Sequence, residues 1–329
     1  MSGRGGEPSR REFMQRAAKA GLGVAVIGGL GWWAHDPKGP DASIDEGPSM
    51  ELPSYAVPGK ESRLAIVKSS HRVPALRAGL EALGGLAAFV QAGNRVVIKV
   101  NAAFASPPAL GATTNPELVA ELTRLCLKAG AKEVIVTDNP INHPASCFEL
   151  TGIGPAARAA GAKVLLPSPA AFRPYSLPGG RLLSNWPLFW EPLARADRVI
   201  GLAPVKDHHR SQASVTMKNW YGLLGGRRNV FHQDINGIIS ELGRMMTPSL
   251  VIADGVTTLA RNGPTGGSLE DLSPTDTMIL GTDQVAVDAC AVGLLGLKPS
   301  QVPWLGLAAA AGAGATDWRS LNPTQVELG

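Results

Sequence analysis

Short runs of β-branched and apolar residues alternate with helical segments along most of this chain, and that alternation limits the folds open to it. Strand-like runs occur at residues 63–69, 95–100 and 132–138 ("RLAIVKS", "RVVIKV" and "KEVIVTD"). Residues 115–130 combine an Asn-Pro helix start with apolar side chains at helical spacing and a terminal glycine. Because the strand-like runs are apolar at nearly every position, both faces of each strand are expected to be covered. The sequence therefore predicts an α/β fold with a mostly parallel sheet and helices on both faces, a three-layer, Rossmann-like arrangement.

The same periodicities predict further elements. They are a helix at 75–90, helix–strand units at 154–168 and 191–204, strands at 249–256 and 276–282, and a helix at 283–296. In an open α/β sheet, ligands bind beyond the carboxyl ends of the strands. Polar side chains lie within or directly after these strand ends: Lys99, Asn101, Asp138, Asn139, Lys206, His208, Asp254 and Asp283. We expect six side chains to surround one cavity: Lys99, Asn101, Lys206, Lys218, Asp254 and Asp283.

Residues 206–226, "KDHHRSQASVTMKNWYGLLGG", gather nitrogen-bearing side chains in a chain with few charges. Lys218 offers a compact cation, and Asn219 offers both a donor and an acceptor. Such a pair suits a carboxylate, a phosphate or a polarised carbonyl. His208 and His209 add either metal ligation or proton transfer near neutral pH. The alternative for this segment is a solvated basic loop before a surface helix.

The charge distribution argues against a nucleic-acid partner. Residues 1–35 carry five of the 31 basic residues and two of the 27 acidic ones, which leaves 26 basic and 25 acidic residues in the remainder. A nucleic-acid surface would need a concentrated basic face. The expected partner of the local basic cluster is therefore a small molecule.

The amino terminus resembles a twin-arginine export signal. Arg10 and Arg11 are followed by Phe13 and by an uncharged stretch at 20–34, which is short and weakly apolar for a bilayer span. The sequence predicts export to the periplasm through the twin-arginine machinery, with membrane contact only through residues 1–35. Because no good Ala-x-Ala site precedes residue 35, an uncleaved anchor is the alternative. A polar, Pro-rich linker is predicted at 36–60 and the α/β domain at 61–329.

Several catalytic and cofactor signatures are missing from the sequence. The three cysteines, Cys126, Cys147 and Cys290, contain no Cys-x-x-Cys pair, so no cysteine-ligated iron–sulfur cluster or structural zinc site is expected. No Walker loop, Gly-x-Ser-x-Gly elbow or His-Glu-x-x-His motif occurs. The "GIGPAA" at 152–157 lacks a strand directly before it, and an ordinary helix start is the better interpretation.

Six short motifs, in order, are similar to those of the domain of unknown function 362 family over residues 62–320. They are "KVN" at 99–101, "TTNP" at 113–116, "KDH" at 206–208, "TMKN" at 216–219, "ADGV" with "RNGPTGG" around 254–267, and "DQVAVD" at 283–288. The resemblance implies a shared polar site built from these residues. Valine replaces the family's proline in "KVN", so the loop there is expected to differ in shape. Many members carry a cysteine-rich iron–sulfur module that is not present here, so electron transfer is not implied.

These observations lead to a functional hypothesis with one rival. We expect an exported enzyme for a small anionic or carbonyl-bearing substrate, in which Lys218 and Asn219 hold the negative charge and His208 moves a proton. Substrate would also be bound by Lys99, Asn101, Lys206 and Asn262.

A metal-assisted version of this hypothesis is the one in which Asp254 and Asp283 hold a divalent cation or orient a base. The ten-residue separation of His208 and Lys218 is similar to a His–Lys spacing in nickel-dependent lactate racemases. The rival hypothesis is a non-catalytic periplasmic binding protein that holds a small anion or metal complex in the same cleft.

Overall fold

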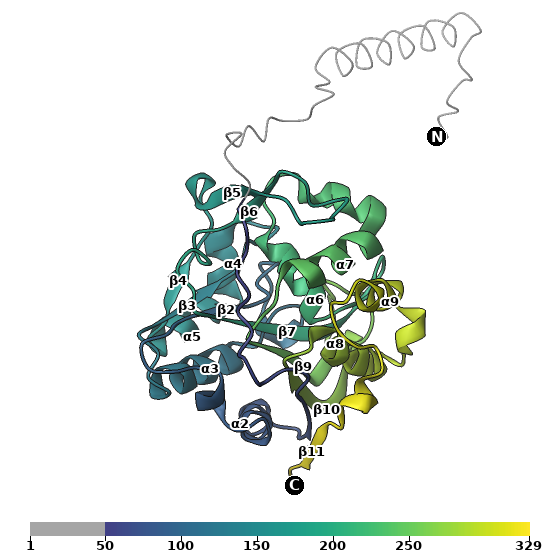
Figure 1. The fold of residues 1–329 in the computed structure, drawn as a ribbon. Helices are drawn as coiled ribbons and strands as arrows, with labels where there is room; N and C mark the ends of the chain where they lie inside the picture. The colour runs from purple at the N-terminus through teal and green to yellow at the C-terminus, as the bar shows by residue number, and fades with distance from the viewer. Residues whose placement is uncertain (1–49) are drawn as a thin grey trace, which may run out of the picture. The chain divides into compact units, whose positions relative to one another are not determined.

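One mixed sheet forms the centre of the computed structural model, which describes residues 50–329 (Figure 1). From one edge to the other, its strands are β11 (Thr324–Glu327), β1 (Leu64–Lys68), β10 (Leu272–Gly281), β9 (Leu250–Leu259), β7 (Arg198–His208), β2 (Arg95–Lys99), β3 (Glu133–Thr137) and β4 (Lys163–Leu165). The short β8 (Gln212–Ser214) forms a hairpin with the end of β7. A separate two-stranded sheet contains β5 (Phe172–Tyr175) and β6 (Trp186–Phe189).

Most neighbouring strands of the central sheet run parallel. The pairs β9–β7, β7–β2, β2–β3 and β3–β4 are all parallel, as is β1–β11. In contrast, β10 runs antiparallel to both of its neighbours, β1 and β9. The predicted mostly parallel sheet is therefore confirmed, with one long strand that points the other way.

Helices cover both faces of the sheet, as the apolar strands predicted (Figure 1). One layer contains α2 (Arg72–Ala82), α3 (Pro116–Lys128), α4 (Pro144–Leu150) and α5 (Ile153–Ala159), and the other contains α6 (Thr216–Asn219), α7 (Ile235–Met245), α8 (Gln284–Ala291) and α9 (Pro303–Ala310). Two hydrophobic clusters result. The alternation along β2 shows how each strand serves both clusters, because Val97 belongs to one and Val96 and Ile98 belong to the other.

Two predicted helices differ from the structure. The helix predicted over 75–90 ends as α2 at Ala82, because Gly84 and Gly85 adopt φ values of 98° and 80° that interrupt it. No helix forms between 191 and 197, where hydrogen-bonded turns lead directly into β7. The Leu193 N–H donates to the Trp190 carbonyl at 2.8 Å in one of these turns, and the Asp197 N–H already donates to the Arg95 carbonyl of β2 at 2.9 Å, which draws the chain into the sheet.

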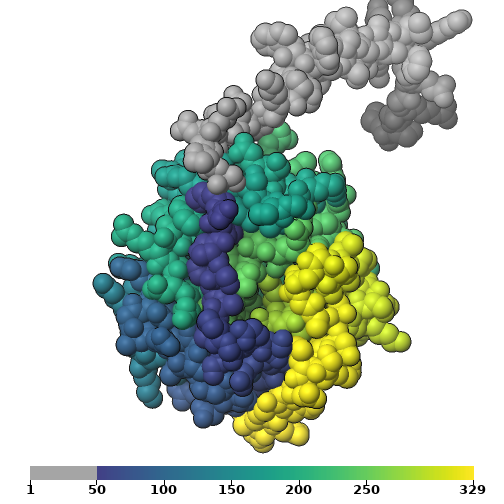
Figure 2. All heavy atoms as spheres, viewed as in Figure 1, coloured from purple at the N-terminus to yellow at the C-terminus, as the bar shows by residue number. Residues whose placement is uncertain are grey.

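Residues 50–58, assigned from the sequence to a linker, pack along the α/β domain. Figure 2 shows this start of the described chain, in purple, lying across the surface. Tyr55 is only 2% exposed; its N–H donates to the Thr247 carbonyl at 2.9 Å and its hydroxyl to the Leu193 carbonyl at 3.3 Å. The predicted export signal at 1–35 and linker residues 36–49 lie outside the described residues. Between residues 50 and 329, no helix combines the length and hydropathy that a membrane span requires.

Candidate functional site

A cavity of about 250 Å³ lies beyond the carboxyl ends of β2 and β3 and beside the end of β7. It brings together residues that are far apart in the sequence. Its walls include Asn101 and Phe104 after β2, Asp138 and Asn139 after β3, Lys206 and His208 in β7, and Lys218, Asn219 and Tyr221 around α6. Five predicted site residues thus line one cavity: Asn101, Lys206, His208, Lys218 and Asn219. This is the edge at which a parallel sheet places its ligands.

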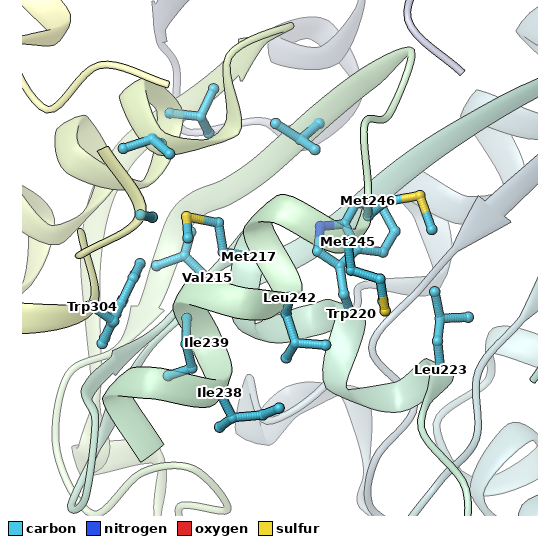
Figure 3. Close-up of a cluster of buried hydrophobic side chains, with 14 of the residues drawn as sticks. Val215, Met217, Trp220, Leu223, Ile238, Ile239, Leu242, Met245, Met246 and Trp304 are labelled. Carbon is cyan, nitrogen blue, oxygen red and sulfur yellow. The ribbon is translucent and has the colours of Figure 1, made fainter. Parts of the chain in front are cut away.

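The helical turn α6 is oriented by its apolar side chains. Val215, Met217, Trp220 and Leu223 point into the cluster that also contains Leu242 of α7 (Figure 3). The intervening Lys218 and Asn219 line the cavity, as do Gly222 and Tyr221, whose ring also packs against the edge of this cluster. The spacing of apolar side chains therefore determines which nitrogen atoms reach the site.

Asp288 of α8 anchors the start of α6. Its carboxylate accepts the Thr216 N–H at 3.0 Å, the Met217 N–H at 2.9 Å and the Thr216 hydroxyl. The two backbone donors are among the N–H groups that a helix leaves free at its first turn. Asp288 is fully buried, and burial raises its pKa to about 7. The second aspartate of the "DQVAVD" motif is thus a positioning residue for the turn that carries Lys218.

Lys99 is a structural cation under the floor of the cavity. Its ammonium forms an ion pair with Asp138 Oδ1 at 2.9 Å and donates to the Asn219 carbonyl and side-chain Oδ1 at 2.7 and 2.9 Å. Both charged side chains are at most 2% exposed. Burial lowers the pKa of Lys99, and the charge of Asp138 opposes that shift. The pair joins β2, β3 and α6, which makes Lys99 a poor candidate for direct substrate contact.

Gly222 is required by this ion pair. A Cβ atom added at this position would lie 1.9 Å from Asp138 Oδ1 and 2.8 Å from Lys99 Nζ. Only a residue without a side chain permits the chain to pass this close to the two charges. The Asn139 N–H also donates to the Gly222 carbonyl at 3.0 Å, which ties the two loops together.

Lys206 is buried without a carboxylate partner. The side chain is 1% exposed, and its ammonium donates to the Ala112 carbonyl at 2.6 Å and to Asn101 Oδ1 at 3.3 Å. It also lies 5.5 Å from the centre of the Phe104 ring. Burial, followed by the nearby charge of Lys218, lowers the pKa of Lys206 to about 7. Asn101 connects Lys206 to the rest of the site, since its Nδ2 donates to Asn219 Oδ1 at 3.3 Å.

Lys218 has even fewer partners. It is half-buried, and its ammonium lies 5.4 Å from the centre of the Tyr221 ring. Among the described residues, no hydrogen bond or ion pair is formed by this ammonium. Burial, followed by the charge of Arg228, lowers the pKa of Lys218 to about 8. A charged group that is removed from water and left unpaired is energetically unfavourable unless a ligand meets it.

Arg228 adds a third cation to the wall of the cavity. Its guanidinium donates to four backbone carbonyls, those of Asn139 and Pro140 on one loop and of Tyr221 and Leu224 on the other. These acceptors hold the cavity walls together but carry no net negative charge. Asp138 is the carboxylate in the cavity wall, and it already pairs with Lys99. Positive charge therefore predominates around the cavity.

His208 is held as a hydrogen-bond donor. It is 3% exposed, and its Nδ1 accepts the backbone N–H groups of Arg210 at 3.2 Å and Ser211 at 3.3 Å. Burial and the charge of Lys218 lower its pKa to about 2, so the ring is neutral with its proton on Nε2. The sequence predicted that His208 would move a proton. The structure instead gives a fixed tautomer, in which Nε2–H can donate to a ligand oxygen.

Two further imidazoles stack near His208. The His209 ring centre lies 5.0 Å away at an interplanar angle of 11°, and the His232 ring centre lies 6.3 Å away. His209 is exposed and contacts the Gly263 carbonyl through Nδ1 at 3.4 Å. Across residues 50–329, no group of three or more His, Cys, Asp or Glu side chains has the geometry to hold a metal ion.

Asp254 and Asp283 do not line the cavity, contrary to the predicted common rim, and neither does Asn262, which was predicted to bind substrate. Asp254 lies within β9, opposite Pro204 and Met278, and accepts from Arg72 Nε at 2.8 Å. Because β10 runs antiparallel to β9, its carboxyl end lies where the other strands begin. Asp283, which follows β10, therefore lies at the opposite end of the strands from the cavity.

These three side chains have other partners instead of a metal or substrate. Asp283 caps α8 by accepting the Ala286 N–H at 2.9 Å and also accepts the Ala315 N–H at 2.9 Å. Asn262 donates to Asp271 Oδ1 at 2.6 Å. The expectation that Asp254 and Asp283 share a divalent cation therefore has no geometric basis.

Several lining residues were not singled out from the sequence. Asp138 and Asn139 were expected at the rim because they follow a predicted strand, but a turn or helix cap explained Asp138 well and neither residue was given a role in the site. Tyr221, Arg228 and His232 lie in short helical turns without a periodic pattern. One indication of a role for His232 was present in the sequence, which is that it lies only a few residues after the 206–226 segment.

A larger groove of about 710 Å³ lies near the amino-terminal ends of β2 and β3. Its charges are mixed: Arg95, Arg173 and Arg195 are accompanied by Glu133 and Glu191. Glu133 already pairs with Arg95 at 3.9 Å. Unlike the smaller cavity, this groove has no excess of unpaired buried charge.

The fold and the cavity define an α/β protein with a cationic ligand site at the carboxyl edge of its parallel strands. The chain belongs to the family described as Domain of unknown function (DUF362), whose model matches residues 96–293. The resemblance drawn from the six motifs is thereby confirmed.

Two individual proteins are also similar to this chain. The "Thylakoid-associated protein sll1697" of Synechocystis is 27% identical over 266 residues, which covers 77% of this chain and 76% of that protein. The solved structure of the lactate racemase apoprotein from Thermoanaerobacterium thermosaccharolyticum aligns with a TM-score of 0.38 and 12% identity. That alignment covers 77% of this chain and 60% of the other, so the chain spans less than two thirds of the racemase.

Proposed function

We propose that this protein is an enzyme that binds a small compound carrying a carboxylate or similar anionic group in the 250 Å³ cavity. The observation that carries the proposal is the pair of lysines, Lys206 and Lys218, which face one small cavity without a carboxylate partner. An anionic ligand supplies the missing counter-charge.

The energetics favour an occupied site. Removing an ammonium group from water costs several kcal/mol, and a nearby opposite charge is needed to offset that cost. The two lysines also repel each other, since the charge of Lys218 contributes to the lowered pKa of Lys206. A bound carboxylate offsets both effects and raises both pKa values towards that of a free lysine.

The donor set suits a carboxylate next to a carbonyl group. Lys206, Lys218 and the Nε2–H of His208 are donors, and the charged ones form the stronger hydrogen bonds. The rings of Tyr221 and Phe104 offer an apolar wall to the remainder of the ligand. A neutral imidazole that donates to a carbonyl oxygen stabilises negative charge developing there.

A non-catalytic binding protein is the second candidate, and the state of His208 favours it. A histidine whose Nδ1 is occupied by two backbone donors cannot act as a general base through that nitrogen. The lowered pKa values of the two lysines favour the enzyme, because an amine that is partly neutral near pH 7–8 can act as a base or nucleophile.

Binding of defined anions tests the proposal. Isothermal titration at low ionic strength would compare pyruvate, lactate and phosphate with glycerol as a neutral control. Lys218→Met should weaken binding of the preferred anion by ~10- to 100-fold, the value of one charge-assisted hydrogen bond. Lys132→Met, the same change at an exposed lysine, should leave the affinity unaltered. Binding that is equal for wild type and Lys218→Met, or absent for all three anions, would contradict the proposal.

We further propose that the protein is exported and that residues 1–35 act as the signal or an uncleaved anchor. The Arg10–Arg11 pair and the uncharged stretch after it support this proposal. The similar Synechocystis protein is named for its association with thylakoids, which supports a membrane-related location for this chain as well.

A further inference from the structure

We infer that Lys218 captures its substrate covalently, by forming an imine with the carbonyl group of a 2-oxo carboxylate held in the cavity. This inference rests on the proposed function, because the same cavity must first bind the anionic end of the molecule. It goes further by naming the substrate class and the atom that forms the bond.

The geometry gives the two lysines different roles. The Lys206 nitrogen is held by the Ala112 carbonyl at 2.6 Å and by Asn101 Oδ1 at 3.3 Å, so its position is fixed and it is not free to attack a ligand. The Lys218 nitrogen has no hydrogen-bond partner among the described residues and faces the cavity beside the Tyr221 ring. Its lone pair, once the proton is lost, is free to attack.

The surroundings favour the neutral amine at Lys218. Burial, together with the charge of Arg228 in the same wall, lowers the pKa of Lys218 to about 8. A desolvated lysine next to another cation is the arrangement in which amines act as nucleophiles near neutral pH. Lys99 differs from Lys218 in this respect. Its ammonium is paired with Asp138 and cannot lose its proton without breaking that ion pair.

The chemical step balances with groups present in the site. The neutral Lys218 nitrogen forms a bond to the carbonyl carbon, the C=O π electrons move to oxygen, and one N–H proton passes to that oxygen. The Lys206 ammonium then gives a proton to the new hydroxyl group, which leaves as water while the nitrogen lone pair completes the C=N bond. The product is an iminium ion with its remaining N–H, and Lys206 regains a proton from solvent. His208 Nε2–H donates to the carbonyl or carboxylate oxygen throughout.

Borohydride trapping tests this step. The full-length protein would be incubated with pyruvate, 2-oxobutyrate or phenylpyruvate, reduced with sodium borohydride, digested and analysed by mass spectrometry. We expect a reduced secondary amine on the peptide that contains Lys218. Lactate, which has no ketone, and propionaldehyde, which has no carboxylate, should give little or no adduct at Lys218.

Two variants separate the nucleophile from its charge. Lys218→Arg keeps the positive charge but has no amine that forms an imine, so it should retain anion binding and lose the adduct. Lys206→Met should reduce trapping at Lys218, because both the proton donor and an anion contact are removed. Lys132→Met should trap as the wild type does.

The outcomes distinguish this inference from the proposed function. Calorimetric binding of pyruvate or its homologues without an adduct at Lys218, or with adducts spread equally over exposed lysines, would overturn the imine and leave the anion site intact. An adduct in Lys218→Arg equal to that of the wild type would also overturn it. If lactate, phosphate and the oxo acids all fail to bind, the proposed function itself is wrong.

Discussion

Replacement of Lys218 by methionine should stabilise the ligand-free protein, although it removes a residue from the proposed site. The pKa of Lys218 falls from its ordinary value of 10.5 to about 8, so its charged form is disfavoured in the folded state. Each pKa unit corresponds to about 1.4 kcal/mol, which puts the full effect at roughly 3 kcal/mol. Because the side chain is half-buried, water screens part of this effect, and we expect an increase of about 1–3 kcal/mol in the free energy of unfolding.

The matched control is the same substitution at Lys99. That lysine is paired with Asp138 at 2.9 Å in a buried environment, so Lys99→Met leaves an uncompensated carboxylate. We expect a loss of roughly 3–5 kcal/mol for this variant. Methionine is close to the lysine stem in size, so both variants test the charge and not the packing.

Urea denaturation of the ligand-free proteins at pH 7, followed by circular dichroism, would measure both effects. The reasoning is refuted if Lys218→Met destabilises the protein as much as Lys99→Met does. That result would mean that Lys218 has a structural partner and that its charge is not available to a ligand.

The pH dependence has a definite sign. Both lowered lysine pKa values mean that the folded protein holds fewer protons than the unfolded chain between about pH 7 and 10.5. Stability should therefore rise with pH across this window, as far as these two groups contribute. Anion binding needs the protonated lysines, so the affinity for anions should fall as the pH rises across the same window.

Four further predictions concern the site and the amino terminus. Titrations with pyruvate or phosphate should show affinity falling above about pH 8, and a pH-independent affinity up to pH 10 would argue against the two unpaired lysines as the anion ligands. Gly222→Ala should lower the melting temperature and abolish anion binding, because the added Cβ meets Asp138 at 1.9 Å; a thermal melt and titration like those of the wild type would show that the loop adjusts. In ¹⁵N NMR spectra, His208 should be the Nε2–H tautomer and should not titrate between pH 5 and 8, as expected from a pKa of about 2; a midpoint near 6.5 would disprove its assignment as a fixed donor. Replacing Arg10 and Arg11 together with lysine should leave the protein in the cytoplasm when the cell is fractionated, and normal export of that variant would exclude a twin-arginine signal.

Much of the site could be predicted because parallel strands share an edge. Asn101 after β2 and Lys206 near the end of β7 were expected to meet, and both line the cavity with Lys206 Nζ 3.3 Å from Asn101 Oδ1, whereas Lys99 lies beneath the cavity and does not line it. This inference needs only strand positions and a common strand direction, both of which leave a signal in local sequence. It failed for Asp283, because the sequence of β10 does not reveal that this strand runs against its neighbours.

The different roles of the three lysines could not be predicted from local sequence. Lys99, Lys206 and Lys218 all stand in similar polar–apolar contexts in the sequence. One is paired with Asp138 and one is bound to a carbonyl and an amide, while Lys218 has no polar partner among the described residues. Partners such as Arg228 come from turns with no periodic pattern, and they reach the site only through tertiary packing.

By itself, the sequence determined the alternation of strands and helices, the two covered faces of the sheet and the family to which the chain belongs. These properties depend on side-chain periodicity and on short motifs, which are local. The tertiary structure alone decided the direction of β10, the tautomer of His208 and the surplus of positive charge around the cavity. The strand direction and the charge surplus depend on contacts between residues distant in sequence, because the pairing of a charge is a property of its neighbours in space. The tautomer depends on the conformation of the turn after β7, which directs the N–H groups of Arg210 and Ser211 at Nδ1 of His208.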